Sequence, residues 1–179
     1  MNFKPLFTDE NCKIVNNENH EACNNCGGKC CYNSGCDIIP KDFKSYPNIT
    51  EDDIMIALAS GYVVIDSASE GYFLKMRGIY TRSDIFYDRY VSPCVALTEN
   101  GCRFKFENRP FGGRILRPQE DTKCYKGAYS FRRAALSWKK YQDLLESIAL
   151  DSMNNKSEFI DKIVKYKKEN FDLSKEIWG

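Results

Sequence analysis

The sequence predicts an α+β fold with a small β-hairpin or sheet, an irregular segment held by bound metal, and C-terminal helices. Three observations predict this fold. One helix signal followed by two strand signals covers residues 50–80, a Pro- and Gly-rich segment covers residues 86–126, and helical periodicity dominates from residue 130 onward.

The first regular elements are a helix and a hairpin. Thr50-Glu51-Asp52-Asp53 is typical of a capping box, so we expect a helix to begin after Thr50 and to end at Gly61. The β-branched and aromatic run 62–66 predicts a strand, residues 67–71 a turn, and residues 72–80 a second strand.

The segment 86–126 has little periodicity, and so long an irregular stretch inside a compact domain is uncommon unless something holds it. Bound metal would do so. Beyond it, apolar residues recur three and four positions apart and predict a helix capped by Ser130, and a second helix begins near Ser157. The apolar face of the first helix comprises Ala134, Ala135, Trp138, Tyr141, Leu144, Leu145 and Ile148.

These signals divide the chain into three parts. Residues 1–22 are expected to form a flexible arm, residues 23–127 a cysteine-cluster metal-binding domain, and residues 128–179 helices packed on that domain. At 179 residues the chain can bury a core of its own, so its cysteines are not needed to replace one.

Composition limits the partners. A net charge of +1 without charged tails argues against a general attraction to nucleic acid or membrane, and no apolar run is long enough to cross a bilayer. The N-terminus lacks the apolar run of a secretory signal, so we expect a cytoplasmic protein with reduced thiols. The odd count of nine cysteines also fits a complete disulfide framework poorly.

Clustered cysteines carry the chemistry. Cys23 and Cys26 have the spacing that lets one tight turn aim two thiolates at a single tetrahedral ion, and Gly27 lets backbone N–H groups turn towards the sulfurs. The spacing predicts a metal site for zinc or iron. Its candidate ligands are Cys23, Cys26, Cys30, Cys31, Cys36, Cys94, Cys102 and Cys124.

The adjacent Cys30 and Cys31 complicate a site with one ion. Neighbouring side chains in an extended segment point to opposite sides. One thiol could therefore pack while the other binds, each could serve its own metal, or a multinuclear cluster could take both. Thiol–disulfide exchange at Cys23 and Cys26 is the redox alternative, although no apolar helical stripe follows them.

Other residues have plainer interpretations. His20, the single histidine, is expected to be solvated in the arm, and Cys12 to be a free thiol. Arg103, Arg109 and Arg114 could offset thiolate charge but are each expected to be solvated surface residues, and Arg109 could alternatively be a structural arginine against carbonyls. Aromatic and basic residues alternate in the C-terminal region, where helical spacing favours a packed core over RNA stacking.

The motif Cys23-x2-Cys26-x3-Cys30-Cys31 resembles that of the cysteine-cluster family of zinc- or iron-chelating domains. The later runs Pro93-Cys94-Val95-Ala96-Leu97, Asn100-Gly101-Cys102 and Glu107-Asn108-Arg109-Pro110 also resemble the family pattern, in the same order. The resemblance covers about residues 20–125.

One departure concerns the ligands that the resemblance implies. The family usually places Cys-Arg shortly after Arg-Pro, where this chain has Gly113-Arg114, so Cys124 could stand in for the missing thiol. The resemblance implies metal chelation without a defined reaction. Some enzymes that methylate flagellin lysines carry a similar cysteine motif beside an iron–sulfur cluster, which keeps iron open.

The sequence thus supports three hypotheses. The first is a protein that binds zinc or iron through clustered cysteines, and the second is an iron–sulfur enzyme or redox accessory protein. The third is an RNA- or protein-interaction module with structural zinc. No sequence feature identifies a substrate.

Overall fold

The computed structural model describes residues 35–80, 85–86, 92–99, 101–104, 108–115 and 131–170. It confirms an α+β fold with small antiparallel sheets and C-terminal helices. The elements in chain order are β1 (Asp37–Ile38), the 3-10 helix η1 (Pro40–Asp42), α3 (Glu51–Ala59), β2 (Val63–Ala68), β3 (Gly71–Met76), β4 (Leu97–Thr98), β5 (Gly101–Cys102), α4 (Phe111–Arg114), α5 (Phe131–Ser137), the 3-10 helix η3 (Lys139–Tyr141), α6 (Gln142–Asn154) and α7 (Lys156–Asn170).

The expected hairpin is confirmed as β2 and β3, which pair in antiparallel register from Val63 opposite Met76 to Ala68 opposite Gly71. A short strand that the sequence did not predict, β1, adds to the other edge of β3 and gives the order β1-β3-β2. The predicted second strand ran to Tyr80, but β3 ends at Met76. Beyond it, Gly78 forms an isolated antiparallel bridge with Cys94 instead.

The predicted capping box at the start of α3 is also confirmed. The Asp53 backbone N–H donates to Thr50 Oγ1 at 3.4 Å, and the Thr50 backbone N–H donates to Asp53 Oδ2 at 2.8 Å. These two bonds give acceptors to backbone N–H groups that have no hydrogen-bond partner within the helix. The helix ends at Ala59, and Gly61 follows with φ +74°, a left-handed conformation that glycine adopts without a Cβ clash.

The helix predicted to begin after Ser130 was expected to be continuous, and this was wrong. It is divided into α5, η3 and α6, with the interruption at Trp138. Trp138 Nε1 donates to the Ile38 carbonyl oxygen at 2.8 Å, and its buried ring packs edge-on against Phe43 at 5.7 Å between centroids. The helix is thus interrupted at the residue whose side chain makes these tertiary contacts, Trp138. The second predicted helix, α7, begins at Lys156, one residue before Ser157.

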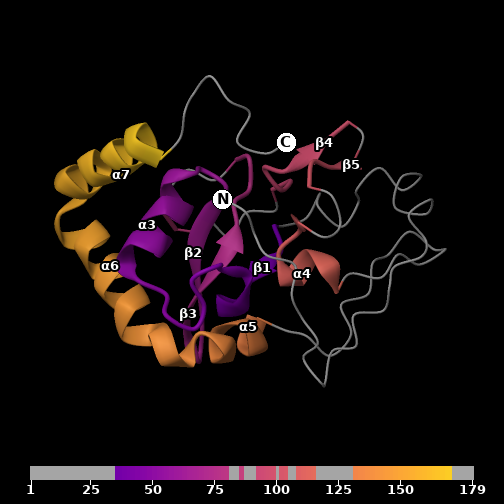
Figure 1. Cartoon of the computed structure of the whole chain (residues 1–179), viewed down its shortest axis with the longest axis horizontal. Helices are drawn as coiled ribbons and strands as arrows, with labels where there is room; N and C mark the ends of the chain where they lie inside the picture. The colour runs from indigo at the N-terminus through magenta and orange to yellow at the C-terminus, as the bar shows by residue number, and fades with distance from the viewer. Residues whose placement is uncertain are drawn as a thin grey trace.

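The helices surround the three-stranded sheet. α5 and α6 pack against β3, α3 packs against β2, and α7 contacts both α3 and α6. In Figure 1 the chain from α5 through α6 to α7 forms an arc around α3 and the sheet, while α4 and the β4–β5 hairpin lie on the opposite side. Within the described residues, no helix combines the length and the apolar character needed to cross a bilayer.

The described parts of the Pro- and Gly-rich segment contain only short regular elements. β4 and β5 are two residues each and form their own antiparallel pair, and α4 has four residues. This pattern agrees with the expectation of little regular structure there. The described parts of the segment contact the rest of the fold. α4 packs against β1, the chain around Cys94 pairs with residues just beyond β3, and Phe86 bridges Ile65 in β2.

Candidate functional site

Cys36 is positioned by the edge of the three-stranded sheet. Its carbonyl oxygen accepts a hydrogen bond from the Met76 backbone N–H at 2.8 Å, and the next residue, Asp37, pairs with Lys75. The preceding Gly35 passes so close that a Cβ there would lie 1.9 Å from the Met76 carbonyl oxygen. Only glycine fits such an approach, and it brings Cys36 to the C-terminal end of β3.

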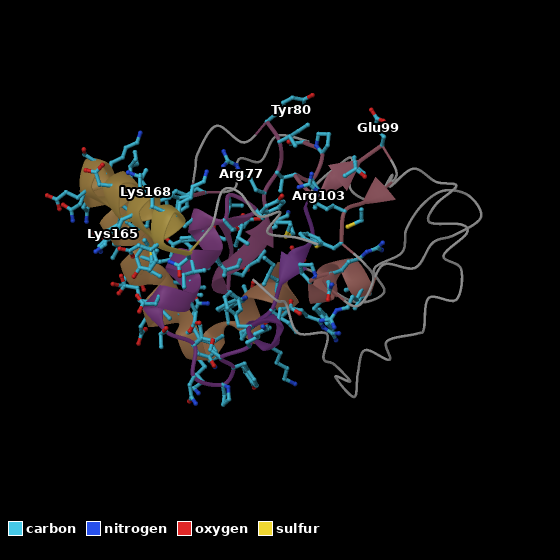
Figure 2. The ribbon with its side chains drawn as sticks, turned by 45° about the horizontal axis from the view of Figure 1, so that its top comes forward. Arg77, Tyr80, Glu99, Arg103, Lys165 and Lys168 are labelled. Atoms are coloured by element: carbon cyan, nitrogen blue, oxygen red, sulfur yellow. The ribbon has the colours of Figure 1, made fainter. Side chains whose placement is uncertain are left out.

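Cys94 and Cys102 reach the same end of β3 through the chain beyond it. The Val95 N–H donates to the Arg77 carbonyl at 2.9 Å, and Gly78 bridges Cys94. Cys102 in β5 then pairs with Leu97 in β4, whose N–H donates to the Cys94 carbonyl at 2.9 Å. Figure 2 shows Arg103, the residue after Cys102, beside β4 and β5.

The three thiols influence one another electrostatically. The pKa of Cys36 is raised well above its ordinary value, first by burial and then by the negative charges of Cys94, Asp37, Cys102 and Asp42. Cys36, Cys94 and Cys102 form no disulfide with one another. The cluster is therefore rich in potential negative charge, and a nearby cation would favour its thiolate forms.

Two glycines let α4 approach this cluster. A Cβ at position 112 would lie 2.6 Å from both the backbone N and the carbonyl O of Asp37. A Cβ at position 113 would lie 3.3 Å from the Sγ of Cys36 and 3.3 Å from the Cβ of Arg109. Gly113 is the position at which the resemblance implied a cysteine, and it borders the Cys36 thiol.

A buried ion pair fixes α4 to η1. Arg114 Nη2 lies 2.7 Å from Asp42 Oδ1, and the side chains are 3% and 0% exposed. The Asp42 carboxylate also accepts the backbone N–H groups of Phe111 at 2.9 Å and Ile39 at 3.0 Å. Burial raises the pKa of Asp42 to about 6, although these hydrogen bonds and the Arg114 charge oppose the rise.

The arginines predicted to be solvated divide into three cases. For Arg114 the prediction was wrong, because its side chain is buried against Asp42. Arg109 is partly buried and its Nε donates to the Phe104 carbonyl at 3.2 Å, which agrees with the structural alternative. Arg103 is exposed as expected, and its Nη1 donates to the Tyr62 hydroxyl at 2.7 Å.

Sequence reasoning missed Asp42. No local pattern marks it, since its partners Phe111 and Arg114 lie about seventy residues away in sequence. The one local signal is Pro40-Lys41-Asp42 after two isoleucines. Pro at the first helical position and an acid in the first turn favour a short helix start there.

The predicted ligands fall into two groups. Cys36, Cys94 and Cys102 lie within the described residues and occupy the same end of β3. The predicted ligands Cys23, Cys26, Cys30, Cys31 and Cys124 lie outside the described residues, as do Cys12, which was predicted to be a free thiol, and His20, which was predicted to be solvated. Within the described part of the chain, no group of three or more His, Cys, Asp or Glu side chains is arranged to hold a metal ion by itself.

The chemistry of the donor set nevertheless fits zinc or iron. Both metals take thiolate ligands in tetrahedral sites, and four ligands are usual for structural zinc. Cys36, Cys94 and Cys102 would contribute part of such a set, so further ligands must come from elsewhere in the chain.

Comparison with protein-family models, curated proteins and solved structures finds no match to this chain. The resemblance to the cysteine-cluster family therefore stays a prediction from the motifs themselves.

Proposed function

We propose that this protein binds zinc or iron through cysteine thiolates, with the metal joining the folded core to the N-terminal cysteine cluster. One observation carries the proposal: backbone pairing brings Cys94 and Cys102, from a distant part of the chain, to the end of β3 at which Cys36 lies. Neighbouring thiolates repel one another, and a bound dication would offset that repulsion.

The remaining ligands in this proposal come from Cys23, Cys26, Cys30, Cys31 and Cys124. The Cys23-x2-Cys26 pair supplies a chelating turn, and the core thiols close the site. Among the described residues no group of three or more His, Cys, Asp or Glu side chains is arranged to hold a metal ion, so the proposal requires ligands from a second segment. Metal binding would then attach the N-terminal cluster to the end of β3.

The proposal requires reduced thiols and thus a reducing compartment such as the cytoplasm. Zinc would be held without redox change, whereas iron could belong to an iron–sulfur cluster in an enzyme or redox accessory protein. Anaerobically purified protein with a cluster would be brown with visible absorbance, and a zinc protein would be colourless.

Chelation tests the proposal directly. We expect a strong chelator to increase hydrogen exchange in the β4–β5 hairpin and at β1, while α3 and the β2–β3 pairing keep their protection. Re-added zinc or iron should restore the protected state in the wild type and in Cys12→Ser, which removes an isolated thiol. Identical exchange with and without chelator would exclude a metal that holds this part of the fold.

A further inference from the structure

The inference concerns α7, the last described helix, which carries three different stripes along its length. Phe159, Ile163 and Tyr166 form the first stripe and face the core. On the first stripe's edge, Lys162 Nζ lies 3.1 Å from Asp151 on α6 and 3.8 Å from Glu51 on α3. These contacts fix how α7 is rotated, so the other two stripes face away from the core.

The second stripe is acidic and internally paired. Glu158, Asp161, Lys165 and Glu169 follow one another at three- and four-residue spacing. Lys165 Nζ lies 3.9 Å from Glu169 Oε1, one helical turn away. This stripe is exposed, and its lysine already has a partner on the same helix.

The third stripe combines aliphatic and cationic side chains. Ile160 and Val164 lie one turn apart and are 39% and 42% exposed. Lys156 precedes them at the same spacing, and Lys167 and Lys168 follow, all exposed. The stripe contains no carboxylate. Among the ion pairs of the described residues, none involves these three lysines.

We propose that this stripe, composed of Lys156, Ile160, Val164, Lys167 and Lys168, docks an acidic amphipathic helix of another protein. Charge complementarity identifies the occupant. A helix with two aliphatic side chains one turn apart and carboxylates on either side would cover Ile160 and Val164 and meet the lysines. From Lys156 to Lys168 the stripe is about 18 Å long, which matches roughly three turns of a partner helix.

A lipid surface fits the stripe less well. Helices that lie in a bilayer interface bury a broad apolar face, commonly with Trp, Phe or Leu. Here the exposed apolar part is one aliphatic residue wide and two long, and the acidic stripe adjoins it. Figure 2 shows Lys165 and Lys168 on α7 at the edge of the molecule, so both stripes are accessible from outside.

Nucleic acid also fits less well. Single-strand binding combines basic grooves with aromatic platforms, and the stripe carries no aromatic residue. The carboxylates of Glu158, Asp161 and Glu169 would repel a phosphate backbone passing along the helix. The aliphatic centre and cationic ends instead match the hydrophobic core and charged rim of a small helix-binding surface.

The test uses the full chain and a fluorescein-labelled helical peptide of about four turns, with two leucines one turn apart flanked by glutamates. Fluorescence anisotropy should show saturable binding that weakens as salt is raised. The double variant K167E/K168E should weaken binding by at least about tenfold, and I160S/V164S by a similar factor. K168E alone reverses one charge on the stripe and should also weaken binding. Its matched control is K165E, which makes the same single charge change on the acidic stripe and should alter binding by less than about twofold.

Circular dichroism melts of each variant confirm that α7 remains folded before its binding is compared. Absence of saturable peptide binding would overturn the proposal. An equal loss of peptide affinity in K165E and K168E would also overturn it, because the peptide would then be attracted to lysines in general and not to this stripe. Tighter binding to phosphatidylserine vesicles or to single-stranded RNA than to the peptide would replace the proposed partner with that class.

Discussion

Gly113 borders the thiol of Cys36: a Cβ at position 113 would lie 3.3 Å from the Cys36 Sγ. Position 113 lies on α4, and the buried ion pair of Arg114 with Asp42 holds α4 against η1. The close approach of position 113 to the Cys36 thiol is therefore fixed by core contacts. A side chain at position 113 would therefore enter the thiol cluster. This makes position 113 a direct probe of the proposed metal site.

The substitution Gly113→Cys is expected to strengthen metal retention, because it adds a thiolate beside Cys36. Under anaerobic conditions the chelator concentration needed to remove half of the metal should rise at least about tenfold over wild type. Gly113→Ser provides the matched control, with a similar side chain but no thiol. Equal metal loss from Gly113→Cys and Gly113→Ser would contradict a metal site at this position.

Gly112 is predicted to tolerate no side chain. A Cβ there meets the Asp37 backbone at 2.6 Å, and backbone cannot move aside as a flexible side chain can. Gly112→Ala should lower the free energy of unfolding by about 1–3 kcal/mol. In Gly113→Ala the nearest atoms belong to side chains at 3.3 Å, so urea denaturation should show a smaller loss. The reverse order of the two variants would contradict the observed packing of α4 on β1.

Trp138 is predicted to stabilise the fold through its indole N–H. Trp138→Phe keeps a packed ring but leaves the buried Ile38 carbonyl without this donor, and should cost about 1–3 kcal/mol of unfolding free energy. Tyr141→Phe is the comparison, since Tyr141 Oη and Lys140 Nζ both donate to the Pro47 carbonyl. Thermal denaturation should rank Trp138→Phe as the more damaging change, and a larger loss from Tyr141→Phe would contradict the account.

Asp42 should make stability depend on pH. Its folded-state pKa of about 6 lies above the ordinary value of 3.8, so the protonated carboxyl is favoured in the folded state. The protonated carboxyl therefore contributes to the free energy of unfolding below about pH 4, and this contribution is lost as pH rises through 6. Measured by urea denaturation across this pH range, the unfolding free energy of the wild type should fall by about 2–3 kcal/mol more than that of Asp42→Asn.

The comparison uses the change with pH and not the absolute difference, because Asp42→Asn also leaves the Arg114 charge buried without its counter-ion at every pH. If the unfolding free energies of the two proteins changed in parallel from pH 4 to pH 7, the Asp42 carboxyl would have an ordinary pKa in the folded state, which would contradict the prediction.

Local signals in the sequence predicted the elements that local chemistry determines. The Thr50 capping box and the β-branched run before residues 67–71 placed α3 and the β2–β3 hairpin correctly. Periodicity also found the C-terminal helical region. It could not predict the break at Trp138, where the indole contacts Ile38, a hundred residues earlier in the sequence.

The candidate site shows the same limit. Cysteine spacing alone marked Cys36, Cys94 and Cys102, yet their shared position at the end of β3 depends on strand pairing that no short motif encodes. Asp42 and Arg114 escaped sequence reasoning because a buried ion pair between distant segments resembles solvated charge until the chain is folded.

The metal content of anaerobically purified protein tests the central claim most directly, with the wild type compared with Cys36→Ser and Cys12→Ser by elemental analysis. The account predicts about one or two zinc or iron ions per chain in the wild type and in Cys12→Ser, and a reduced ratio in Cys36→Ser. Wild-type protein without bound zinc or iron, or Cys36→Ser with the full wild-type ratio, would contradict it.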